Sequence, residues 1–136
     1  MEIPFRIRGI KTLQYAIFPE ELRQGSIQVE SKYEFGANIE NRFITCCADF
    51  NYKQEDRLIL VLKIACHFEI EQKGFESFNE KGQFRIPADF LRYMGTITVG
   101  AARGIIHAKT EGTSINPIVL PPINLVETIK DDYIIK

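Results

Sequence analysis

The sequence of 136 residues lacks the short motifs that mark most catalytic and metal centres. It has two histidines, His67 and His107, and no HxxxH or CxxC spacing, so we expect no zinc or other metal site. It also has no GxGxxG, GxxxxGKS/T or GxSxG pattern, which excludes the common phosphate-binding loops and the serine nucleophile elbow. We therefore expect no cofactor and no catalytic residues.

An excess of charge of one sign is lacking as well, because 17 Lys and Arg residues nearly cancel 18 Asp and Glu residues. Nucleic-acid binding depends on clustered excess cations, so the net charge of -1 argues against a nucleic-acid partner. No stretch approaches the roughly 18 consecutive apolar residues of a membrane span, and residues 1–6 do not resemble the start of a signal peptide. The three cysteines form no disulfide framework, so we expect a reduced cytoplasmic protein.

Apolar residues make up 45% of the chain, which fits a single domain over residues 1–136. Alternation of apolar and polar residues predicts four strands, over residues 3–17, 26–35, 42–52 and 58–70. The connectors at 36–38 and 53–56 are short and polar enough for hairpins. We therefore expect a four-stranded antiparallel meander with one apolar face and one polar face.

The second half changes to a helical period, and Pro87 is suited to open a helix over residues 88–110. Its apolar stripe covers nearly half of the circumference, with Phe90, Leu91, Met94, Ile97, Ala101, Ala102, Ile105, Ile106 and Ala108. Gly100, Gly104 and Ala108 form a line of small residues that allows close approach of another backbone, from this chain or from a second subunit. The width of the stripe favours association between subunits.

An apolar, proline-rich loop follows at residues 111–124 and contains Ile118, Leu120 and Ile123. Residues 125–135 are predicted to form a short helix that begins at Leu125, with Asn124 as its N-cap. Such a loop either caps the core or forms the wall of a hydrophobic groove. The sequence thus predicts an α+β domain with a meander sheet, a long helix, an apolar crossover loop and a short C-terminal helix.

Candidate catalytic pairs are weak. Cys66 and His67 are neighbours on one predicted strand and point to opposite faces, which prevents the histidine from activating the thiol. Glu69 and Glu71 share a strand face about 7 Å apart, a spacing compatible with acid–base chemistry. A solvated sheet face is the simpler interpretation, and a small-molecule enzyme remains a remote alternative.

The order of these elements resembles the SecB family of export chaperones, and short motifs support the resemblance. They are Phe5-Arg6-Ile7-Arg8-Gly9-Ile10, Phe68-Glu69-Ile70-Glu71-Gln72-Lys73-Gly74-Phe75, Ala102-Arg103-Gly104-Ile105-Ile106, and Gly112-Thr113 followed by Leu120-Pro121-Pro122-Ile123-Asn124-Leu125. The resemblance implies a homotetramer, built as a dimer of dimers, with the long helix at its interfaces. The interface residues would be Met94, Ile97, Gly100, Ala101, Gly104, Ile105 and Ala108.

The resemblance also implies binding of unfolded polypeptides in a hydrophobic groove near the crossover loop and second helix. The binding residues would be Phe75, Phe78, Phe84, Ile118, Leu120, Ile123 and Leu125. Such a groove binds by burying apolar side chains, at about 25 cal/mol per Å², and needs no sequence code.

This chain departs from the family at the acidic face that docks on the translocase motor. The two acidic positions of the first strand are Gln14 and Phe18 here, and only the acid of the fourth strand is kept, as Glu69. These departures argue against hand-off to the export motor. A dedicated adaptor for one partner, such as the antitoxin of a toxin–antitoxin pair, is therefore the alternative to a general chaperone.

Overall fold

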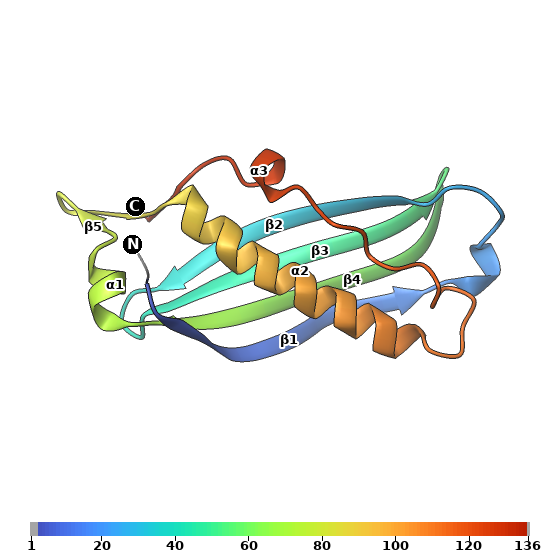
Figure 1. The fold of residues 1–136 in the computed structure, drawn as a ribbon, viewed down its shortest axis with the longest axis horizontal. Helices are drawn as coiled ribbons and strands as arrows, with labels where there is room; N and C mark the ends of the chain where they lie inside the picture. Colours follow the sequence, from blue (N-terminus) through green and yellow to red (C-terminus); the bar gives the residue numbers. More distant parts are fainter. Residues whose placement is uncertain (1–2, 136) are drawn as a thin grey trace.

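The computed structural model describes residues 3–135, in which a long helix lies across one face of a four-stranded antiparallel sheet (Figure 1). The sheet contains β1 (Phe5–Ile17), β2 (Gln28–Asn38), β3 (Phe43–Gln54) and β4 (Arg57–Ile70). The long helix is α2 (Ala88–Thr110). The predicted α+β class is confirmed, and so are four strands followed by a long helix and a short one.

The order of the strands corrects the predicted meander. The order is β1-β4-β3-β2, so β1 pairs with β4, with Phe5 opposite Ile70 and Ile17 opposite Leu60. Only β2, β3 and β4 form a meander. The segment 18–27, which includes η1 (Pro19–Glu21), is too long for a hairpin and leads from one edge of the sheet to the other. The side chain of Gln54 holds this segment, since it accepts from the N–H of Arg23 (2.8 Å) and donates to its carbonyl (2.7 Å).

One face of the sheet forms the core, as the alternation predicted. Along β3, every second residue from Ile44 to Gln54 is buried, and the residues between are partly exposed. The buried side chains of β3 and β4, such as Phe50, Leu62 and Phe68, point toward α2. Each one contributes about 1.5–3 kcal/mol through removal of its apolar surface from water.

Helix α2 begins after Pro87, as predicted, and directs Leu91, Met94, Thr98, Ala102 and Ile106 to the sheet. The buried Thr98 hydroxyl donates to the carbonyl of Met94 (2.9 Å), so this polar group is satisfied inside the core.

The helix runs alongside β1 and contacts it near both ends. The ring of Tyr93 lies 5.4 Å from that of Phe5, and the Tyr15 hydroxyl donates to the carbonyl of Lys109 (3.3 Å). The middle of β1 lies between these two contacts.

A small second sheet, which the sequence did not predict, closes the end of the molecule where α2 begins. Its strands are β5 (Asn79–Glu80), β6 (Gln83–Ile86) and β7 (Tyr133–Ile135), in the order β5-β6-β7. Helix α1 (Gln72–Glu76) leads into it from β4. The rings of Phe75, Phe78 and Phe84 pack against one another there, with centroids 4.7–6.2 Å apart.

The predicted C-terminal helix is wrong beyond its first turn. Helix α3 covers only Leu125–Thr128, with the Asn124 side chain accepting from the N–H of Val126 (3.1 Å) as the predicted N-cap. The chain then turns because Asp132 binds the start of α2. One of its oxygens accepts from the N–H of Ala88 (2.8 Å), and the other pairs with Arg85 (3.2 Å).

Helix α3 packs closely on α2 at Gly95. A Cβ built at this glycine would lie 3.1 Å from the terminal carbons of Leu125 and Ile129, so the missing side chain allows the close approach. Within residues 3–135, no helix has both the length and the apolar character to cross a lipid bilayer.

Candidate functional site

The crossover loop, residues 111–124, both covers the core and remains partly open. Ile115 and Leu120 are buried and belong to the core, whereas Ile118 and Ile123 are half-buried. Val119 is 64% exposed, which is unusual for an apolar side chain in an ordered segment. The loop therefore caps the core and also forms the wall of an open apolar surface.

Arg103 of α2 holds the loop in place. Its Nε donates to the carbonyl of Leu120 (2.8 Å) and one terminal nitrogen donates to the carbonyl of Pro121 (3.0 Å). Further along, the amide of Asn116 donates to the carbonyl of His107 (3.0 Å), near the end of the helix. Hydrogen bonds from a charged donor are worth about 1.5–3 kcal/mol, so the loop is fixed at a set distance from α2.

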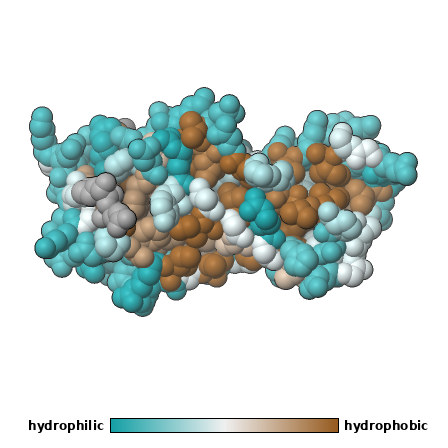
Figure 2. Space-filling view, in the orientation of Figure 1, coloured by the Kyte–Doolittle hydropathy of each residue, from teal (hydrophilic) through white to brown (hydrophobic). Residues whose placement is uncertain are grey.

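A cavity of about 370 Å³ lies between α2 and the loop, and we call it the crossover groove. It is lined by Gly100, Arg103, Gly104, Ile106, His107, Asn116, Ile118, Val119 and Leu120. Figure 2 shows an apolar surface in the same region, on the side of α2 that faces the loop. The volume falls within the range of about 300–1,000 Å³ that is usual for ligand pockets.

The glycines of the predicted small-residue line are open rather than packed. A Cβ built at Gly100 or Gly104 would have no other atom within 4 Å, so nothing in the described chain approaches the helix there. Close packing inside the subunit, one of the two interpretations of this line, is therefore excluded for these two positions. They leave space on the helix surface where side chains would otherwise fill the groove.

The predicted binding residues are divided between the core and the groove. Ile118 and Leu120 line the groove, and Ile123 is half-buried on the same loop. Phe75, Phe78 and Phe84 are only 3–8% exposed, at the end of the molecule where α1 lies. Leu125, the first residue of α3, is buried against α2 at Gly95. The prediction that the three phenylalanines form a binding surface is therefore wrong, because their rings are buried and pack against one another.

The predicted interface residues are divided as well. Met94 is fully buried against the sheet, so it cannot contact a second subunit. Ile97, Ala101 and Ile105 lie half-buried on the flank of α2 that faces β1, and Ala108 is exposed.

Two residues of β1 extend this flank. Ile7 and Ile10 point to the helix side, because their partners Phe68 and Cys66 do, yet they are 43% and 50% exposed. We call Ile7, Ile10, Ile97, Ala101 and Ile105 the open apolar strip. Figure 2 shows an apolar area below the middle of α2, where β1 passes.

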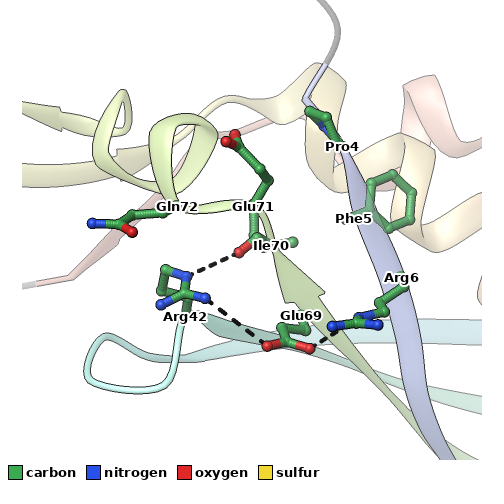
Figure 3. Close-up of a pocket in the computed structure, with 8 residues that line it drawn as sticks. All are labelled: Pro4, Phe5, Arg6, Arg42, Glu69, Ile70, Glu71 and Gln72. Atoms are coloured by element: carbon green, nitrogen blue, oxygen red, sulfur yellow. Dashed lines mark hydrogen bonds and ion pairs between the residues drawn. The ribbon is translucent and has the colours of Figure 1, made fainter.

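Glu69, the predicted docking acid, is surrounded by arginines. Its carboxylate lies 3.1 Å from Arg6 and 4.0 Å from Arg42, as Figure 3 shows, and 3.5 Å from Arg8, and its side chain is 23% exposed. It is therefore engaged within the chain and is not a free acid for a cationic partner.

The candidate catalytic groups also have structural roles. One oxygen of Glu71 accepts from the N–H of Gly74 (2.9 Å) and caps α1, and Nδ1 of His67 lies 2.8 Å from the Thr45 hydroxyl. Cys66 is fully buried, and burial raises its pKa above the usual range, so the reactive thiolate is disfavoured. Within residues 3–135, no three His, Cys, Asp or Glu side chains are grouped as metal ligands would be.

Two features of the site were not predicted from the sequence. Arg103 lies within the predicted helix, but nothing in the sequence indicates that it binds loop carbonyls. Val119 belongs to the apolar loop, and no sequence signal separates it from its buried neighbours.

A comparison of the chain with known protein families, curated proteins and solved structures gives no match.

Proposed function

We propose that this protein is a chaperone that binds unfolded polypeptide segments in the crossover groove, in the manner of the SecB family that its sequence resembles. The observation that carries the proposal is an apolar cavity with two open glycines on one side and a loop held at a fixed distance on the other.

The physical features of the groove agree with binding that does not depend on sequence. Ile118 and Val119 provide apolar contact, and burial of a large aliphatic or aromatic client side chain releases about 1.5–3 kcal/mol. A wall that is already ordered loses little conformational entropy on binding. The exposed Val119 would be covered by the client.

Filling the groove is expected to weaken client binding about tenfold, the equivalent of about 1.4 kcal/mol. In Gly104→Phe the added Cβ has no atom of the described chain within 4 Å, so the backbone accepts the substitution and the ring occupies the groove that Gly104 lines. The change also removes a poor helix former, so the free energy of unfolding should not fall. The measurement is suppression of aggregation of a chemically denatured protein, titrated with wild-type and variant chains.

The matched control is Gly36→Phe, which adds the same side chain on β2 where a Cβ also has no neighbour. Gly36 is opposite Thr45, on the face of the sheet away from α2. Equal suppression by Gly104→Phe, Gly36→Phe and wild type would contradict the proposal. Suppression limited to one of several unrelated denatured proteins would favour the dedicated adaptor instead.

The same proposal includes association of copies of the chain through the open apolar strip. Strand β1 is an edge strand with one unpaired side, and a long edge with exposed apolar side chains is a ready site for pairing with another chain. The half-buried residues of α2 beside it add to the apolar area that a second copy would cover.

Ile10→Lys is expected to convert an oligomer to the monomer of 15.6 kDa, because it places a charge in the centre of the covered surface. Light scattering after size-exclusion chromatography gives the mass. The control is Ile39→Lys, at an equally exposed isoleucine (51%) in the turn between β2 and β3. A wild-type chain that is monomeric at high concentration would rule out this association.

A further inference from the structure

The arginines around Glu69 form a cationic site at one end of the sheet, on the face opposite α2. Arg6 and Glu69 are cross-strand partners on β1 and β4. Arg8 reaches the same carboxylate because a register shift lies between Ile7 and Gly9. Arg42 approaches from the turn before β3. One carboxylate thus holds three guanidinium groups within 4.0 Å.

The positive charge extends along this half of the outer face. The register places Lys11 opposite Ala65 and Gln14 opposite Lys63, so both lysines point outward with Glu69. The cations on this half are Arg6, Arg8, Lys11, Arg42 and Lys63, and the acid among them is Glu69. The half formed by β2 and β3 is nearly balanced, with Glu30, Glu34 and Asp49 beside Lys32 and Lys53.

A cavity of about 430 Å³ lies next to the arginines, as Figure 3 shows. Its polar lining consists of Arg6, Arg42, Glu69, Glu71 and Gln72, and its apolar lining of Pro4, Phe5 and Ile70. Pro4 is exposed, whereas Ile70 is fully buried and the ring of Phe5 packs against α2. The carboxylate of Glu71 turns away from Arg42 in this view and caps α1. The cavity therefore presents the two arginines beside the exposed ring of Pro4.

The arginines keep N–H groups that can bind a ligand. Each guanidinium carries five N–H donors. Arg6 uses Nε for Glu69 (3.1 Å), and Arg42 uses Nε for the carbonyl of Ile70 (3.2 Å). The side chains of Arg6 and Arg8 are 70% and 49% exposed. Nη2 of Arg42 already lies 4.0 Å from Glu69, so the terminal nitrogens that remain for a second carboxylate are Nη1 of Arg42 and both terminal nitrogens of Arg6.

We propose that this cationic site binds an acidic segment of a partner polypeptide, with an apolar residue next to its carboxylates. The carboxylates pair with Arg6 and Arg42, and the apolar residue enters the cavity beside Pro4. Glu69 competes with the ligand for the guanidinium groups. The site is separate from the crossover groove, and the proposal does not depend on client binding there.

Charge distribution favours an acidic peptide over a nucleic acid. A nucleic acid needs a continuous row of cations that matches its phosphates. Here Glu34 and Asp49 border the cationic half on the same face, and the chain as a whole has a net charge of -1. A short peptide with clustered carboxylates fits within the cationic half.

The test uses a fluorescent peptide in which paired glutamates stand next to a leucine, with fluorescence anisotropy as the readout at low salt. The wild-type chain should bind this peptide and not a version with glutamine in place of glutamate. The double variant Arg6→Gln/Arg42→Gln should bind about tenfold more weakly or worse. Added salt should weaken wild-type binding, because the contacts are partly exposed.

Two further variants make the test specific. Glu69→Gln should bind the acidic peptide more tightly than wild type, because it removes the competing carboxylate. Lys32→Gln/Lys53→Gln, on the balanced half, should leave the affinity nearly unchanged. The proposal is overturned if the glutamine peptide binds equally well or if Glu69→Gln weakens binding. It is overturned as well if the lysine variants weaken binding as much as the arginine variants, or if an oligonucleotide of equal charge binds more tightly.

Discussion

Replacing Phe78 with alanine is expected to lower the free energy of unfolding by about 3–5 kcal/mol. The ring is 3% exposed, and its centroid lies 5.4 Å from that of Phe90 and 5.9 Å from that of Phe84. The substitution therefore removes an aromatic side chain from a packed cluster and leaves a cavity. Urea unfolding followed by circular dichroism measures the loss.

This result would separate a core role for the phenylalanines from a binding role. Substitution of a surface residue that binds clients would instead lower the affinity for clients and leave the free energy of unfolding nearly unchanged. Tyr93→Ala is the matched control, since this aromatic side chain is 60% exposed and loss of its ring contact with Phe5 should cost no more than about 1.5 kcal/mol. If the alanine variant does not fold, Phe78→Leu removes less volume and should give a smaller loss in the free energy of unfolding that can still be measured. Equal stability of the Phe78 variants and wild type would contradict the packed cluster.

Alkaline pH is expected to destabilise the protein by about 4 kcal/mol through Cys46 alone. Burial raises the pKa of this thiol from 9.0 to about 12. Between these two values the unfolded chain has lost the thiol proton and the folded chain retains it. The unfolded state then binds fewer protons, so stability is complete below pH 9 and falls as the pH rises toward 12.

The measurement is the free energy of unfolding in urea at a series of pH values. Burial also raises the pKa of Tyr52, to about 12, so part of the decline will persist without the thiol. Cys46→Ala should make the decline distinctly shallower, whereas Cys47→Ala, on the outer face, should change it much less. Parallel curves for wild type and Cys46→Ala would show that the thiol is not buried as described.

The elements with one strong local signal could be predicted from the sequence. Helix α2 follows from Pro87 and a helical apolar period, and the four strands follow from alternation along each segment. Strand neighbours could not be predicted in the same way, because alternation specifies which face is buried and not which strand lies beside it. The hydrogen bond of Asp132 with the start of α2 is a long-range contact, and no local pattern in residues 125–135 reports it.

The candidate sites were predicted only in part, for a related reason. The apolar character of the crossover loop indicated a surface near Ile118 and Leu120, and the structure places both in the groove. The burial of Phe75, Phe78 and Phe84 depends on their mutual packing, which composition does not reveal. The cationic site combines Arg6, Arg42 and Glu69 from three segments, so it exists only once the register of the sheet is known.

The pairing of β1 with β4 has a consequence for the order of folding. Strands β2, β3 and β4 are joined by short turns and can assemble from local contacts. The contact between Arg6 and Glu69 spans 63 residues, and closing such a loop is entropically costly. We therefore expect β1 to join the sheet after β2, β3 and β4 have paired. Both the open apolar strip and the cationic site include residues of β1, so each forms only when folding is complete.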